Sequence, residues 1–494
     1  MASPILAAFA AVLGKGETVA RQSLEHCLRI ICDFRDSDAL ADLVNAFAGQ
    51  SSEINYVSFV QWLFNEEPSA ADAAEAAAEA LFRRGFSVRQ LIHFVKRYRS
   101  YGGQSLSTMT TAQVVRDIVI PETRERRCAM VELFEGGPKE PVCLMSHWWG
   151  HSFMSLVEAI MGHASGQLLP VENLLSEEEL KKTYWLCIFG VNQHVSICGT
   201  IQNPCDCGSE KFLNGHPLCE MDKFGVMMKR MQEHALALDR QMWTLTRIWV
   251  LKELQTALAM NICTEFAGSL SFAGPFADEK HLPSVRDAEA SRPEDRKLIL
   301  TEIEATLGVD AFDQAIRSKV RQEKTKLAFF DALVRRQVEQ VAELLEKDPS
   351  LCNVQLRHFG LKSPLHFMCE RTRTATEWED LSGRKEILEK LFRLRADPTL
   401  RDSCGRTPLH CICMWDGDVT LAKRLVSCRA DVTARAWRGA VSGKTPLELL
   451  ESEVKISVQH FDRGYQSRST RKTQELQDYL RSLELAESSP VAAR

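Results

Sequence analysis

The chain has 494 residues, of which 45% are hydrophobic and 26% charged, and its formal net charge is −5. This is the balance of an ordinary globular protein of roughly two to four domains, and it excludes the basic footprint of a nucleic-acid-binding protein. No apolar run reaches the roughly 18 residues that span a bilayer, so we expect no membrane span. Sixteen cysteines scattered along a long chain favour reduced thiols and a cytoplasmic location.

Residues 1–129 have a helical pattern. An alanine-rich stretch at 70–81 has high intrinsic helix propensity, and 88–98 alternates apolar and basic residues at helical spacing. The segment from Ile54 to Phe64 looks like the second half of an EF-hand. Ser52 and Ser58 stand where a calcium loop requires glycine and a bidentate glutamate, so we interpret the segment as a degenerate EF-hand-like helix pair that does not bind calcium.

Residues 130–275 follow a different pattern, in which short apolar runs alternate with amphipathic helices. Buried strands are predicted at 142–145, 184–189, 235–238 and 262–266, and helices at 152–161, 224–234 and 245–260. Strands that are apolar on both faces and separated by helices are typical of a parallel sheet with helices on both sides. We therefore predict an α/β domain over 130–275.

Three motifs in this domain carry a family resemblance. Ser146-His-Trp-Trp-Gly150 follows the first strand, Asn192-Gln-His194 follows the second, and the late helix contains Trp249 through Glu253 and Leu254. Together they resemble the Toll/interleukin-receptor/resistance (TIR) domain and its heterokaryon-incompatibility relatives. The resemblance implies a flavodoxin-like fold with five parallel strands. It also implies either a self-associating module or an enzyme that cleaves NAD⁺, in which the glutamate at position 253 is catalytic.

The chemistry of Glu253 can be argued from the residues as well. Cleavage of the bond between nicotinamide and ribose passes through an oxocarbenium-like state, which a nearby carboxylate stabilises. Trp249 lies one turn before Glu253 on the same helix face, where an indole would desolvate the carboxyl group and raise its pKa. Ser146, Trp148 and Trp149 follow a strand at the edge where open α/β sheets bind ligands, so with Trp249 they are candidates for binding NAD⁺. The alternative is that Glu253 is an ordinary surface charge and the tryptophans are core residues.

An insertion at about 196–221 follows the second predicted strand and contains candidate metal ligands. Cys205, Cys207, His216 and Cys219 form a Cys-x-Cys…His-x-x-Cys set, whose four ligands suit a structural zinc ion. Four protein ligands would leave no open position for catalysis. Ordinary free thiols of a reducing compartment are the alternative.

Residues 276–323 are polar and helical in pattern and are predicted to be a connector. Beyond them, three segments repeat one motif: Lys362-Ser-Pro-Leu-His366, Arg406-Thr-Pro-Leu-His410 and Lys444-Thr-Pro-Leu-Glu448. Proline at a first helical position, preceded by a capping hydroxyl residue, suits the start of a helix. The motif is similar to the Thr-Pro-Leu-His signature of ankyrin repeats, which implies an all-α solenoid over 324–485. In that family the histidine links neighbouring turns.

We therefore predict a multidomain chain: a helical region (1–129), a flavodoxin-like α/β domain (130–275), a connector (276–323), ankyrin repeats (324–485) and a disordered tail (486–494). An ankyrin stack offers a binding surface and no reactive group, so we expect it to bind a protein partner, with the insertion at 372–383 and its Trp378 as a candidate contact loop. The predicted function is an intracellular signalling scaffold in which the TIR-like domain forms homo-oligomers. The alternative is an NAD⁺ hydrolase that uses Glu253 and is regulated by the repeats.

Overall fold

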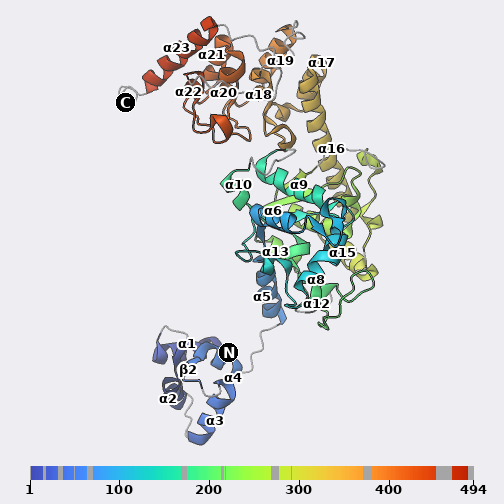
Figure 1. Cartoon of the computed structure of the whole chain (residues 1–494), viewed down its shortest axis with the longest axis vertical. Coiled ribbons are helices and arrows are strands. Elements are labelled where there is room, and N and C mark those ends of the chain that lie inside the picture. The colour runs from blue at the N-terminus through green and yellow to red at the C-terminus, as the bar shows by residue number, and fades with distance from the viewer. Residues whose placement is uncertain are drawn as a thin grey trace. The chain divides into compact units, whose positions relative to one another are not determined.

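The structure is a computed structural model that describes residues 2–14, 18–31, 37–48, 51–63, 70–167, 175–212, 216, 218–268, 278–290, 292–370, 381–451 and 470–487. The chain divides into two compact units (Figure 1). Residues 1–79 with 215–219 form the first, and residues 80–214 with 220–494 form the second. Among the helices in the described ranges, none has both the length and the apolar character that a bilayer crossing requires.

The first unit contains two helix–strand–helix segments whose strands pair with each other. These are α1 (Ala2–Leu13), β1 (Thr18–Ala20) and α2 (Arg21–Ile31), then α3 (Ser37–Ala48), β2 (Glu53–Asn55) and α4 (Tyr56–Leu63). The strands are antiparallel, with Val19 opposite Ile54. The Asn55 side chain accepts a hydrogen bond from the Ser58 amide at 2.9 Å, which satisfies a free N–H at the start of α4.

The second unit is built on a five-stranded sheet. Its strands are β3 (Phe86–Ser87), β6 (Cys143–Ser146), β7 (Thr183–Trp185), β8 (Glu233–Ala237) and β9 (Thr264–Ala267), in the order β3-β7-β6-β8-β9. β6 to β9 are parallel, as predicted, but β3 runs antiparallel to β7. The expected all-parallel sheet is therefore corrected to a mixed one, because the fifth strand comes from residues before the first predicted strand and joins the β7 edge.

Helices cover both faces of this sheet. On one face, α6 (Val88–Arg97) and α9 (Phe153–Ser165) pack with Cys143, Met145 and Ala235 in one apolar core. On the other, α13 (Phe224–Met228) and α14 (Ile248–Ala259) pack with Leu144 and Leu236. Successive residues of a strand point to opposite faces, which is why neighbours in β6 and β8 belong to different cores. The arrangement is the doubly covered sheet that the apolar strands predict.

Residues 80–129 pack with the α/β domain, although their helical pattern groups them with the N-terminal region. Val88, Phe94 and Ile118 lie in the same core as α9. The other helices and strands of this segment are β4 (Ser100–Tyr101), β5 (Gln104–Ser105), α7 (Thr111–Val114) and α8 (Ile120–Thr123). The helix α5 (Ala70–Phe82) precedes them, and α10 (Glu177–Lys181), α11 (Cys187–Gly190) and α12 (Gln193–Ser196) belong to the α/β domain. The side chains at 88–98 thus cover a sheet face instead of forming a separate helical region.

One long helix joins the α/β domain to the repeats. After α15 (Pro293–Thr306), α16 runs from Val309 to Arg335 without a break. Its first half packs Phe312 and Val320 against the core of α14, and its second half packs Phe329 and Phe330 into the core of the repeats. The sequence places the connector boundary at 323, but no proline or glycine interrupts the helix there, so the connector and the first repeat share one element.

The repeats stack as short helices around one apolar core. They comprise α17 (Val338–Lys347), α18 (Pro364–Cys369), α19 (Leu381–Arg393), α20 (Pro408–Cys411), α21 (Val419–Ser427), α22 (Pro446–Glu451) and α23 (Thr470–Glu487). Pro364 and Pro408 occupy the first turns of α18 and α20, as the motif predicts. The predicted contact loop at 372–383 lies outside the described residues as far as residue 380, and the predicted tail does so from residue 488.

Candidate functional site

A buried chain of polar groups lies between the sheet and α14. Ser146, the last residue of β6, is hydrogen-bonded to His234 Nε2 at 2.8 Å and donates a second, shorter bond to the Glu253 carboxylate. His234 Nδ1 is in turn 2.9 Å from the Thr264 hydroxyl. In the strand order, β7 lies on one side of β6, and β8 and β9 lie on the other. Ser146 therefore stands at the carboxyl end of a strand where the strand order switches sides, which is where open α/β sheets bind ligands. The structure thus brings the two predicted residues Ser146 and Glu253 together.

Burial decides the charge of these groups. It raises the pKa of the Glu253 carboxyl to about 7, although the hydrogen bond from Ser146 lowers that pKa. Burial also lowers the pKa of His234 to about 4, so its imidazole is neutral near pH 7. The Ser146 hydroxyl hydrogen can rotate and the imidazole can change tautomer, so the chain can serve either protonation state of the carboxyl group. The arrangement can therefore hold or pass a proton between Glu253 and His234.

Each of the three predicted tryptophans contacts another side chain of the domain. The Trp249 ring contacts Phe224, with centroids 6.2 Å apart, and its indole acts as a hydrogen-bond donor to Asp295. Trp148 packs on Trp243 at 6.5 Å between centroids. Trp149 donates from its indole nitrogen to the Cys187 sulfur at 3.3 Å. These contacts hold the three indoles in place, and burial of Glu253 between α14 and the sheet desolvates its carboxyl group.

A cavity of about 240 Å³ lies at the carboxyl ends of β8 and β9. It is lined on the α9 side by Glu158 and His163, and by Arg240 and Arg357 from later parts of the chain. Arg357 belongs to the repeat region and donates a 2.6 Å hydrogen bond to Glu265 of β9. The residues that line this cavity include neither Ser146 nor Glu253. The cavity is lined by α9, which covers one face of the sheet, whereas the polar chain lies under α14 on the other face.

The cysteine-rich insertion is arranged differently from its predicted form. Cys205 and Cys207 lie close to His194 and Cys198, and the ligand atoms of these four residues are all within 4.8 Å of one another. His216 and Cys219 are not members of this group and belong to the first compact unit. Sequence reasoning missed His194 and Cys198, although both stand just before or within the insertion. The available signal was their spacing of four residues, which suits one turn of helix.

In the repeats, the motif histidines link neighbouring turns. His366 Nδ1 is 2.8 Å from the Ser363 hydroxyl and accepts from the Ser363 amide, while Nε2 is 2.8 Å from the carbonyl oxygen of Arg406. His410 repeats the pattern, with Nε2 3.2 Å from the Lys444 carbonyl oxygen. Each imidazole thus caps its own helix and donates to the next repeat. Burial lowers the pKa of both imidazoles, which keeps Nδ1 available as an acceptor.

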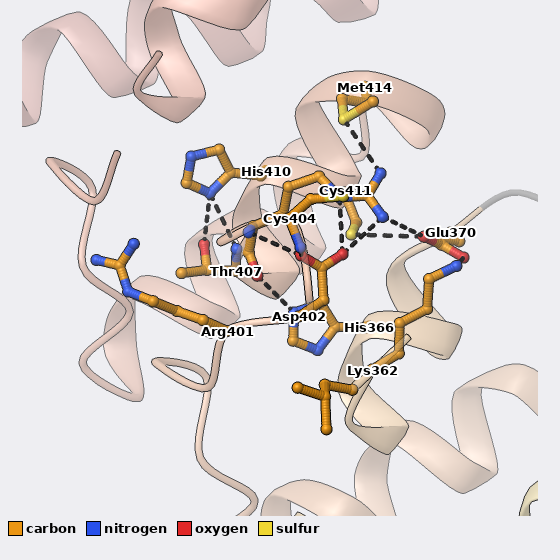
Figure 2. Close-up of polar contacts among 12 residues, drawn as sticks. Lys362, His366, Glu370, Arg401, Asp402, Cys404, Thr407, His410, Cys411 and Met414 are labelled. Carbon is orange, nitrogen blue, oxygen red and sulfur yellow. Dashed lines mark hydrogen bonds and ion pairs between the residues drawn. The ribbon is translucent and has the colours of Figure 1, made fainter. Parts of the chain in front are cut away.

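Figure 2 shows a buried ionic network between the first and second motifs. Asp402, 1% exposed, accepts hydrogen bonds from the Cys404 and Arg406 amides, both at 2.9 Å. The Arg406 guanidinium contacts Asp402 at 2.6 Å and Glu370 at 3.8 Å. Lys362 completes the network with a 2.7 Å contact to Glu370. This network closes the loop that precedes α20 and ties it to α18.

The sequence of residues 404–437, which includes Arg406 and His410, matches the family model "Ankyrin repeat". The chain contains an ankyrin repeat. The match starts in the loop that Asp402 closes and ends at Trp437, so it takes in α20, α21 and the turn after them. The motifs at 362–366 and 444–448 flank this ankyrin repeat and form equivalent helix starts. A search of curated proteins finds no match to the chain.

Sequence reasoning missed an exposed aromatic side chain at the end of this ankyrin repeat. Trp437 is 57% exposed, and its ring lies against Gly405, where an added Cβ would come within 2.3 Å of the indole. The Arg401 guanidinium stands 5.4 Å from the centre of the ring. Alternation was the available signal, since Val432, Ala434 and Ala436 are buried and the residues between them face outward.

Proposed function

We propose that this protein is a cytoplasmic signalling scaffold whose ankyrin repeats bind a protein partner. The observation that carries the proposal is Trp437, a large apolar side chain that is held at the surface of the stack. The described cysteines are all free, which supports a reducing compartment. Stacked repeats of this kind present a continuous surface for binding another protein.

The surroundings of Trp437 indicate the chemistry of the partner. Its backbone N–H donates to the Cys404 carbonyl at 3.0 Å, and the ring rests on Gly405 beside Arg401, so little side-chain freedom remains to be lost on binding. Tryptophan and arginine are the residues most often found at interface hot spots. Arg435, also exposed, adds a second cation. We therefore expect an apolar pocket with acidic residues at its rim on the partner.

The test is affinity capture with the full-length chain, comparing wild type with Trp437→Ala and with Leu258→Ala. Leu258 is 40% exposed in α14, so its substitution removes a similar exposed apolar group outside the repeats. We expect Trp437→Ala to weaken partner binding by about 2 kcal/mol, roughly 30-fold in affinity. The same partners should be retained by Leu258→Ala. An identical set of partners, bound equally by the wild-type and Trp437→Ala proteins, would contradict the proposed surface.

We further propose that the α/β domain gives the scaffold its output by self-association, as the TIR resemblance implies. β9 forms an edge of the sheet over the described residues, and a sheet edge offers unpaired backbone groups to a second copy. The measurement is the mass of the full-length chain by light scattering over a concentration series. We expect the mass to rise with concentration. A constant single-chain mass would remove self-association from the proposal and leave partner binding intact.

A second candidate function is NAD⁺ hydrolysis by Glu253. The observation that favours it is a buried carboxyl group with a pKa near 7, next to Ser146 at the edge where parallel sheets bind ligands. The separate location of the cavity weighs against it. The test is NAD⁺ consumption by the full-length chain, with Glu253→Gln compared against Glu158→Gln, a carboxyl group of the cavity. Turnover that needs Glu253 but not Glu158 would establish the enzyme. Absence of turnover at high protein concentration would reject it.

A further inference from the structure

The insertion after β7 folds four potential metal ligands into one cluster. The Cys198 sulfur is 3.6 Å from the Cys207 sulfur and 3.5 Å from His194 Nδ1, and the Cys205 sulfur is 3.7 Å from the same nitrogen. His194, Cys198 and Cys207 are buried, and Cys205 is half-buried. Two of the ligands follow the start of α12, and the other two come from the loop after it. Gly208, with φ of 66°, follows the Cys-x-Cys pair in a conformation that glycine adopts without strain.

We propose that His194, Cys198, Cys205 and Cys207 bind one zinc ion in a tetrahedral site. Zinc–sulfur bonds of about 2.3 Å and zinc–nitrogen bonds of about 2.0 Å place tetrahedral sulfurs about 3.8 Å apart and sulfur and nitrogen about 3.5 Å apart. The three distances above match these edges without rearrangement. This set keeps Cys205 and Cys207 of the sequence-based hypothesis and replaces His216 and Cys219 by His194 and Cys198.

The groups around the cluster orient the ligands as a metal site requires. His194 Nε2 is 2.8 Å from the Thr123 hydroxyl, which leaves Nδ1 to face the three sulfurs. A hydrogen bond at the distal nitrogen is the usual means of fixing the tautomer and ring orientation of a ligating histidine. Lys211 Nζ lies 3.1 Å from the Cys198 sulfur. Zinc with three thiolates carries one net negative charge, which this ammonium group offsets.

A disulfide explains the cluster less well. A disulfide between Cys198 and Cys207 requires the sulfurs to approach from 3.6 Å to about 2.05 Å, and it gives no role to Cys205 or to the His194 ring that both thiols face. All four ligand positions of the zinc site come from this chain, so the site is closed and structural. Its effect would be to pin the insertion against α8, where Thr123 ends the helix. The metal takes no part in the chemistry considered for Glu253.

The experiment measures zinc in the full-length chain, purified reduced and without chelators, by plasma mass spectrometry. We expect about one zinc per chain in the wild type and less than about a tenth of that in Cys198→Ser/Cys207→Ser. The matched control is His216→Ala/Cys219→Ser, which should keep the wild-type content. Zinc lost from the control and kept by the first variant would overturn the assignment in favour of the other ligands.

A second measurement needs no substitution and so does not depend on the variants folding. The zinc of the wild-type chain is removed with a chelator under reducing conditions, and Co²⁺ is then added. We expect the strong visible absorption of tetrahedral Co²⁺ together with a near-ultraviolet thiolate band, saturating at about one equivalent and displaced by Zn²⁺. A wild-type protein that holds no zinc and develops only the weak colour of hydrated Co²⁺ would overturn the proposal. A thiol count that is lower by two, because two of these cysteines form a disulfide, would also overturn it.

Discussion

The Asp402 carboxylate and the Arg406 guanidinium form a buried ion pair at 2.6 Å where the ankyrin repeat begins. Removing one partner of such a pair strands the other charge away from water. We expect Asp402→Ala to lower the free energy of unfolding by about 3–5 kcal/mol, measured by urea denaturation. The exposed pair of Asp331 and Arg335 is the control, because Asp331→Ala should cost about 0.5 kcal/mol or less. Equal effects of the two substitutions would show that burial does not set the strength of the Asp402 pair.

The second prediction concerns acid sensitivity of the repeats. Burial lowers the pKa of His410 to about 4, while an unfolded histidine titrates near 6.5. The folded state therefore resists protonation, and its stability is fully present above pH 6.5 and is lost as the pH falls toward 4. We expect His410→Gln to flatten the dependence of unfolding free energy on pH in this window, by an amount on the order of 3 kcal/mol. Parallel pH profiles for the two proteins would refute the assignment.

The third prediction has the opposite sign. Burial raises the pKa of Glu253 to about 7, above its ordinary 4.5, so the folded state favours the protonated carboxyl group. The resulting stability is present below pH 4.5 and is lost as the pH rises through 7. Glu253→Gln removes that titration. We expect the free energy of unfolding of the variant, relative to that of the wild type, to rise by on the order of 3 kcal/mol from pH 5 to pH 8. Urea denaturation at a series of pH values measures it. A difference that stays constant over this range would show that Glu253 is not desolvated.

The fourth prediction uses the turn after α19. Arg395 has a positive φ of 60°, and the amide after it donates to the Leu391 carbonyl at 2.9 Å, which is the geometry of a helix end that glycine favours. We expect Arg395→Gly to stabilise the fold by up to about 1 kcal/mol, seen as a higher Tm. Arg393→Gly is the matched control within α19 and should destabilise by about 1 kcal/mol. A lower Tm for Arg395→Gly would mean that the arginine side chain makes a contact that outweighs its backbone strain.

Local pattern was sufficient for much of the fold. The strands at 142–145 and 235–238 correspond to β6 and β8, because a strand buried on both faces is apolar at every position. The helix starts at Pro364 and Pro408 and the links made by His366 and His410 also follow from short motifs. For the strands and the helix starts, one stretch of chain contains all the residues that the element needs. The histidine links follow because the same motif recurs in the next repeat.

Other features depend on contacts between distant residues, and the sequence does not show them. Phe86 joins the sheet as an antiparallel edge strand because β7, nearly a hundred residues later, offers its open side. The fold likewise brings the Trp249 ring against Phe224 and joins Ser146 to both His234 and the Glu253 carboxylate.

For this protein, the sequence by itself determined the repeat motif, the positions of the parallel strands and the candidacy of Glu253, because these are local patterns. Only the tertiary structure decided which side chains meet. His194 and Cys198 instead of His216 and Cys219 stand beside Cys205 and Cys207, and the Trp437 side chain lies at the surface. The physical reason is that a site is a set of distances in space, and chain spacing limits those distances only within a few residues.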